Sequence, residues 1–185
     1  MEERGDAADT RPRRVGEHEG SALHLLSIPS FDAWPRELGP LDSTVQVLFV
    51  AADAREVGDA ELLAAARRAV ASGARFVATW GPGCVRVHDA FDRVVIDEHF
   101  REGEETVDDV ILTTWHDREA LDDALFFFLF AAEPASAYVE SCRTRLAVAV
   151  GSDDWSARIE QALAAPEAFL LDRVAEDDHA HGPDS

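Results

Sequence analysis

The chain has 185 residues, a length that suits one domain with short extensions, and its 37 acidic and 17 basic residues give a formal net charge of −20. Such a charge repels the phosphate backbone of nucleic acids and anionic membrane surfaces, and no basic patch opposes it. We therefore expect neither nucleic acid nor membrane as a partner. A hydrophobic fraction of 46% excludes wholesale disorder.

The basic residues are all arginines, and the sequence contains neither lysine nor asparagine. We attribute this bias to a GC-rich bacterial genome. Without lysine, Schiff-base and Walker A chemistry are excluded. The cysteines, Cys84 and Cys142, form no C-x-x-C pair, the N-terminus is charged, and no apolar segment approaches the roughly 18 residues of a spanning helix. These features predict a cytoplasmic protein with free thiols.

Composition changes along the chain predict its domain organisation. Residues 1–20 mix acidic residues and arginines with almost no apolar side chains, which predicts a disordered tail. Residues 21–43 combine a short apolar run with several prolines, and we expect them to wrap the surface of the domain. A single α/β domain should span residues 44–175, followed by an acidic tail over 176–185.

Apolar runs of strand length alternate with segments of helical periodicity. Strands are predicted over residues 45–50, 75–80, 93–96, 110–115 and 146–151, with a solvated loop over 97–109. Helices are predicted from Asp59 to a stop at Gly73, from Cys84, over Asp117–Ala132 and after the N-cap Ser152, with a break at Pro166. This alternation predicts an α/β three-layer sandwich with a mainly parallel sheet of about five strands, flavodoxin-like or Rossmann-like.

Two tryptophan-containing motifs stand where predicted strands end. W-G-P-x-C-x-x-x-H-D covers Trp80 to Asp89, and T-T-W-H covers Thr113 to His116. Together with the acidic, Phe-rich helix that follows, they resemble an uncharacterised bacterial family, a domain of unknown function, over about residues 44–163. The resemblance implies a recurring structural unit and carries no activity.

In open parallel sheets, ligands bind beyond the carboxyl ends of the strands. The side chains at or after the predicted strand ends, which we expect to bind a ligand, are Asp53, Trp80, Thr114, Trp115, Ser152 and Trp155. Trp80, Trp115 and His116 should line one concave surface. Because no G-x-G-x-x-G follows the first strand, a dinucleotide is not expected, and we assign no cofactor.

Cys84 is a second candidate for chemistry because it opens a predicted helix, where the helix dipole lowers the pKa of a thiol. His116 or His88 could act as the base, and Asp89 or Asp117 could orient it, in a nucleophilic site. The alternative, which we favour, is that Cys84 is a small buried hydrophobe.

The same residues could instead ligate a metal. Cys84, His88 and His116 would supply three ligands, with Asp53 or an aspartate near Asp154 as the fourth. Neither H-E-x-x-H nor C-x-x-C spacing is present, so we assign no metal site.

Phe126, Phe127 and Phe130 project from the side of their predicted helix that does not face the sheet. Either the Trp34 segment or the terminal helix with Phe169 covers these rings, or they form an interface with a protein partner or a second copy.

These observations predict a non-enzymatic bacterial binding or regulatory domain that acts through protein contact or a small-ligand pocket at the strand ends. The alternative is a cysteine- or metal-dependent hydrolase or transferase built on Cys84, His88 and His116. The Cys-x5-Arg loop of phosphatases is excluded because Ala90 stands where the arginine is needed, and G-x-S-x-G is absent.

Overall fold

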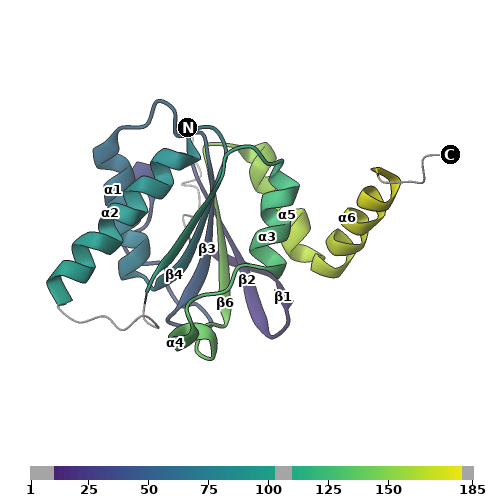
Figure 1. Cartoon of the computed structure of the whole chain (residues 1–185), viewed down its shortest axis with the longest axis horizontal. Helices are drawn as coiled ribbons and strands as arrows, with labels where there is room; N and C mark the ends of the chain where they lie inside the picture. Colours follow the sequence, from purple (N-terminus) through teal and green to yellow (C-terminus); the bar gives the residue numbers. More distant parts are fainter. Residues whose placement is uncertain (1–10, 103–109, 181–185) are drawn as a thin grey trace, which may run out of the picture.

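The computed structural model describes residues 11–102 and 110–180, which form a three-layer α/β sandwich around a six-stranded sheet (Figure 1). The strands are β1 (Arg13–His18), β2 (Ser21–Ile28), β3 (Gln46–Ala52), β4 (Ala74–Trp80), β5 (Leu112–His116) and β6 (Thr144–Val150). The helices are η1 (Phe31–Ala33), α1 (Asp59–Ala71), α2 (Cys84–Glu102), α3 (Leu121–Phe130), α4 (Ser136–Val139), α5 (Asp153–Ala164) and α6 (Pro166–Ala180). The predicted α/β class and mainly parallel sheet are confirmed, with six strands in place of about five.

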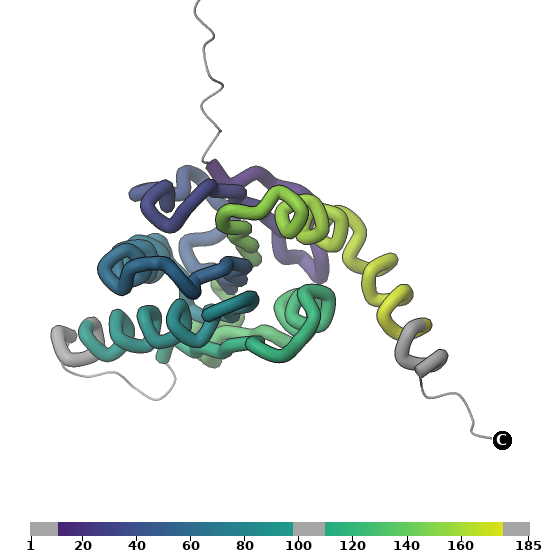
Figure 2. The backbone as a smooth tube through the Cα atoms, turned by 90° about the horizontal axis from the view of Figure 1, so that it is seen from above, coloured from purple at the N-terminus to yellow at the C-terminus, as the bar shows by residue number. Residues whose placement is uncertain are grey.

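The strand order is β1-β2-β6-β3-β4-β5, and every neighbouring pair except β1 with β2 is parallel. From β3 the chain runs through α1 to β4 and through α2 to β5, with both helices on one face of the sheet. It returns through α3 to β6 and continues into α5 on the other face (Figure 2). Consequently β3 and β6 lie side by side, but the chain leaves their carboxyl ends toward opposite faces.

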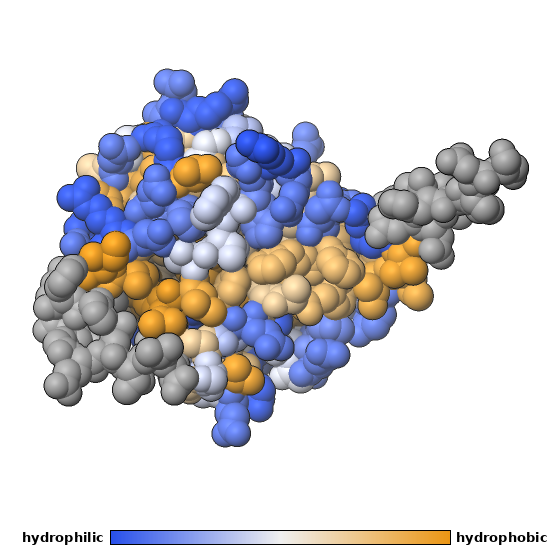
Figure 3. Space-filling view, in the orientation of Figure 1, coloured by the Kyte–Doolittle hydropathy of each residue, from blue (hydrophilic) through white to orange (hydrophobic). Residues whose placement is uncertain are grey.

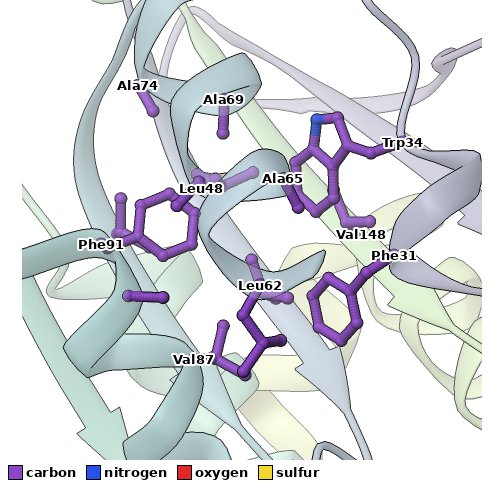
Figure 4. Packing of buried hydrophobic residues seen from close by; sticks show 14 of the residues in the cluster. Phe31, Trp34, Leu48, Leu62, Ala65, Ala69, Ala74, Val87, Phe91 and Val148 are labelled. Atoms are coloured by element: carbon purple, nitrogen blue, oxygen red, sulfur yellow. The ribbon is translucent and has the colours of Figure 1, made fainter. Parts of the chain in front are cut away.

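Hydrophobic layers cover both faces of the sheet. On one face, Leu48 of β3 packs beneath α1 and α2 with Phe91 and with Trp34 from the segment after η1 (Figure 4). On the other face, Phe49 meets Phe128 of α3 with ring centroids 5.3 Å apart. All residues of β3 are buried, so its continuous apolar sequence reflects cover on both sides.

The N-terminal segment differs from the prediction of a tail over residues 1–20 and a wrapping segment over 21–43. β1 and β2 form a hairpin, and its two turn residues, Glu19 and Gly20, both have positive φ, 46° and 76°, as a type I′ turn requires. β2 is buried along most of its length because β6 pairs with its other edge. β1 and β2 therefore belong to the folded unit, and residues 1–10 lie outside the described residues.

The strand predicted over residues 93–96 is wrong, because these residues belong to α2. Val87, Phe91 and Val94 are buried at helical spacing. The β-branched run is therefore part of a helix, in which Val94 lies on the buried side and Ile96 is exposed. The same helix includes the start of the predicted loop over 97–109, and the rest of that loop lies outside the described residues.

The C-terminal half also shows shifted boundaries. α3 begins at Leu121, later than the predicted start at Asp117. α6 begins at Pro166, where the break was predicted, but it continues into the predicted acidic tail over 176–185, whose last residues lie outside the described ones. No helix in the described ranges is long and apolar enough to cross a membrane.

Candidate functional site

The carboxyl ends of β2, β3 and β6 surround a cleft of about 390 Å³. It lies where β3 and β6, which are neighbours, send the chain into α1 and α5 on opposite faces of the sheet. Open α/β sheets bind their ligands at such a point, where the strand order reverses. The volume falls within the range of roughly 300–1,000 Å³ that small-molecule sites occupy.

Three of the predicted ligand-binding residues, Asp53, Ser152 and Trp155, meet in this cleft. Asp53 follows β3, whereas Ser152 is the N-cap of α5 and its Oγ accepts the backbone N–H of Trp155 at 3.3 Å. The predicted N-cap is therefore confirmed. Because a hydroxyl both donates and accepts, the Ser152 proton can still be offered to a ligand.

The carboxylate of Asp53 is held by Arg55. The Arg55 guanidinium donates from Nε to Oδ1 at 2.9 Å and from Nη2 to Oδ2 at 2.5 Å, and the Arg55 backbone N–H adds a bond to Oδ1 at 3.2 Å. These hydrogen bonds hold the pKa of Asp53 below its usual range. The cleft therefore carries an ionised, oriented carboxylate at neutral pH.

Arg86 of α2 fixes the loop that follows β3. Its guanidinium donates to the carbonyl oxygens of Ala54 at 2.5 Å, Arg55 at 3.1 Å and Val57 at 2.7 Å, and to Oδ1 of Asp59 at 2.6 Å. The sequence does not reveal this role of Arg86, because three of its partners are backbone carbonyls far away along the chain. The contacts tie the Asp53 loop to α2 and preorganise it for binding.

Gly151, directly after β6, is hydrogen-bonded to the end of β2. Its N–H donates to the Ile28 carbonyl at 2.8 Å, its φ is +72°, and a Cβ atom there would come within 3.3 Å of the Pro29 carbonyl oxygen. Any other residue would be strained at this positive φ, and its Cβ would crowd the Pro29 carbonyl. Glycine therefore allows the loops after β2 and β6 to approach and form one wall of the cleft.

Trp80, Thr114 and His116 gather beside the cleft on the α3 face. Trp80 and His116 are register neighbours on β4 and β5, and the Trp80 ring meets that of Trp155 edge-on, with centroids 5.2 Å apart. Glu119 holds both side chains, because its carbonyl accepts Trp80 Nε1 at 2.9 Å and its Oε2 lies 2.7 Å from His116 Nδ1. Thr114 Oγ1 lies 3.3 Å from His116 Nε2. This group borders the cleft through the two indole rings.

Trp115 points to the opposite face, because side chains alternate along a strand. Its ring lies 4.7 Å from that of His88, whose Nε2 is 3.1 Å from Thr113 Oγ1. Thr113 donates to Asp92 Oδ1 at 2.5 Å, and His88 Nδ1 lies 3.4 Å from Asp89 Oδ1. The network ties α2 to the edge strand β5. The predicted single surface of Trp80, Trp115 and His116 is therefore wrong for Trp115.

Cys84 is fully buried at the start of α2. Burial raises the pKa of its thiol, and the backbone N–H groups of His116 and Val85 oppose only part of this effect. The expected lowering by the helix dipole is therefore wrong. Since His88 and His116 lie on opposite faces of the sheet, the structure does not bring the predicted catalytic residues into one group.

The residues considered as metal ligands do not come together within the part of the chain that the structure describes. No group of three or more His, Cys, Asp or Glu side chains there could hold a metal ion. The four-ligand set considered from the sequence is distributed over both faces of the sheet and the cleft.

The phenylalanines of α3 are partly buried within the chain. Phe127 packs against the sheet, with its ring 6.0 Å from that of Phe76, so the predicted outward direction is wrong for Phe127. The Phe126 and Phe130 ring centroids lie 5.1 Å apart, and Phe130 meets His18 edge-on at 5.0 Å. Trp34 lies on the other face of the sheet and does not cover them. His18 of the β1–β2 hairpin therefore lies against Phe130, a contact that the sequence pattern does not predict.

Comparison with known proteins places the chain in a family. Residues 23–166 match the model described as "Domain of unknown function (DUF7684)", a range that begins in β2 and ends at the start of α6. The match contains all the loops that form the cleft, and it begins earlier than the resemblance noted from residue 44. A search of curated proteins finds no match. The resemblance to an uncharacterised domain family is thus confirmed, and the chain belongs to the DUF7684 family.

Proposed function

We propose that the protein is a binding domain that holds a small polar molecule in the cleft at the carboxyl ends of β2, β3 and β6. The observation that carries this proposal is the convergence of three loops, distant in sequence, on one cleft at the reversal of strand order. Asp53, Ser152 and Trp155 contribute a carboxylate, a hydroxyl and an indole ring to its walls.

The lining indicates the chemistry of the ligand. The Asp53 carboxylate already accepts from Arg55 through both oxygens and has only its remaining lone pairs to offer. Glu61 is the freer carboxylate, because its Oε1 accepts only a backbone N–H of Asp32, at 3.2 Å, among the hydrogen bonds described for it. Hydrogen-bond donors on the ligand, such as amine or hydroxyl groups, match these acceptors. Trp155 and Val57, both partly exposed, offer apolar surface for the rest of the molecule. The net charge of −20 favours a ligand that carries positive charge.

The same geometry argues against the cysteine-dependent alternative. Neither histidine nor cysteine stands among the residues that line the cleft. The candidate nucleophile, Cys84, is fully buried, and burial raises the pKa of its thiol. Thiolate is the nucleophilic form, so this environment works against a cysteine-dependent enzyme.

The proposal is tested by a ligand-observed NMR screen of amine-bearing aromatic fragments. The proteins compared are the wild type, Trp155→Ala, which removes a cleft wall, and Trp115→Ala, a matched control on the other face of the sheet. Ser30→Tyr places a large ring in the cleft and removes no capping hydrogen bond, because the Ser30 side chain makes none with the 3-10 helix that it caps. We expect fragments that bind the wild type and Trp115→Ala about tenfold more tightly than either cleft variant.

Thermal unfolding of each variant shows whether it is folded under the conditions of the screen. If folded Ser30→Tyr binds every fragment as the wild type does, the cleft is not the site. Binding lost only in Trp115→Ala would move the site to the α2 side of β5, and the proposal would fail.

A further inference from the structure

One carboxylate in the cleft at the carboxyl ends of β2, β3 and β6 has no positive partner among the described residues. The cleft lining has two acidic side chains, Asp53 and Glu61, and the described part of the chain contributes neither arginine nor histidine to it. Asp53 is paired with Arg55, whose guanidinium binds both carboxylate oxygens. No ion pair of the described residues includes Glu61, so the cleft holds one uncompensated negative charge.

The arginines that follow Glu61 on α1 are engaged elsewhere. Arg67 pairs with Asp97 at 3.8 Å, and Arg68 donates to the carbonyl oxygen of Trp34 at 2.8 Å. The protein therefore places no cation of its own on the Glu61 carboxylate within the described ranges. A ligand with positive charge would supply the missing partner.

Glu61 also has a structural contact, which leaves part of its carboxylate available. The side chain stands in the first turn of α1, and its Oε1 accepts the backbone N–H of Asp32 at 3.2 Å. This bond joins the loop around η1 to α1. A carboxylate has about four lone-pair sites, so Glu61 can accept further hydrogen bonds from a ligand while it keeps this contact.

The rest of the lining fits an ammonium group beside a small apolar body. The hydroxyl oxygens of Ser30 and Ser152 line the same cleft and can accept N–H donors. Trp155 and Val57, both partly exposed, can cover the apolar part of the molecule. Phe31 is buried, so the lining lacks the several exposed rings with which proteins bind quaternary ammonium groups.

The surroundings of the cleft are polar. The carboxyl ends of the strands are uppermost in Figure 1, where β4 leads into α2. Figure 3 shows the same view, and most atoms along this upper edge are hydrophilic. The cleft therefore belongs to a polar end of an acidic molecule, which suits a ligand with positive charge.

We propose that Glu61 makes the cleft selective for a molecule with one primary or secondary ammonium group. The ammonium N–H groups would donate to the Glu61 carboxylate, and the apolar body would lie against Trp155. A neutral alcohol of the same shape lacks the charge, and a quaternary ammonium compound lacks the N–H donors. The inference rests on the proposed function, because it assigns specificity at the same cleft.

The test compares three probes of similar shape by ligand-observed NMR titration of the full chain at low ionic strength: benzylamine, benzyl alcohol and benzyltrimethylammonium. We expect the wild type to bind benzylamine about fivefold more tightly than either other probe. Glu61→Gln keeps an oxygen that can accept the Asp32 N–H, and it should bind benzylamine and benzyl alcohol alike. Glu56→Gln removes one charge from the neighbouring loop outside the lining, so this exposed control should keep the wild-type preference.

Thermal unfolding shows whether each variant is folded. A preference for benzylamine that survives in folded Glu61→Gln overturns the inference, and so does an equal loss of preference in Glu56→Gln. Tight binding of benzyltrimethylammonium would exclude a role for N–H donors and overturn it as well. If none of the three probes binds the wild type, the inference fails, while the fragment screen with Ser30→Tyr decides separately whether the cleft binds ligands.

Discussion

Cys84 shows how the surroundings of one side chain decide its chemistry. The positive end of a helix stabilises a thiolate by typically about 0.3–1 kcal/mol, which is less than one pKa unit. Desolvation of a fully buried group shifts a pKa by up to about 3–5 units in the opposite direction. The thiol is fully buried, so desolvation prevails and the pKa rises. The sequence reveals that Cys84 starts a helix, but not that other atoms cover it completely.

We expect the Cys84 thiol to resist alkylation in the native protein. In Cys142→Ser, iodoacetamide should modify Cys84 at least about 100-fold more slowly than in denaturant, because reaction requires both opening of the structure and ionisation of a thiol whose pKa is raised. The rate should increase with pH through the alkaline range. Rapid native modification with a midpoint well below the ordinary value of about 8.5 would restore Cys84 as a candidate nucleophile.

At the scale of elements, the site depends on loops held by residues from other elements. Asp53 stands on a loop after β3, and Arg86 of α2 binds three backbone carbonyls of that loop. Pro82, before α2, accepts the Ala54 N–H at 2.7 Å. The conformation of the Asp53 loop is therefore a property of the β4–α2 connection, which passes beside it.

Removal of the Arg86 side chain should loosen this loop. In Arg86→Ala, we expect the free energy of unfolding in urea to fall by about 2 kcal/mol, because the partly buried carbonyls lose their donors. Hydrogen exchange at the Ala54 amide should become faster. The control is Arg67→Ala, an exposed α1 arginine with a single described ion pair to Asp97 at 3.8 Å, which should change stability by less than about 0.5 kcal/mol. An equal effect of both substitutions would show that Arg86 has no special role.

Elements whose burial matches their sequence pattern could be predicted, and the others could not. β3 is covered on both faces, so its apolar run identifies it without its neighbours. Residues 93–96 have the composition of a strand, but Val94 is buried as part of a helix side that also contains Val87. A short apolar run has no visible period, which is why the pattern there fitted two structures. β1 gave no apolar signal, because none of its residues is buried at the edge of the sheet.

At the scale of the molecule, strand order creates the cleft. β2 and β3 are consecutive in sequence but lie on either side of β6, which comes near the end of the domain. Sequence patterns identify strands but do not state which strands are neighbours. They could therefore place the six predicted ligand-binding residues at strand ends, but they could not tell on which face of the sheet each side chain lies. Strand order brings Asp53 and Ser152 together, and alternation along β5 sends Trp115 away from His116.

The most direct test of ligand binding in this cleft is a map of amide and indole chemical shifts in the isotope-labelled full chain, titrated with the tightest amine-bearing fragment from the screen. We predict that the largest changes occur at Asp53, Gly151, Ser152 and the indole N–H of Trp155, and that they saturate with one affinity. Changes centred on Cys84 or Trp115, with the cleft resonances unmoved, would contradict the account.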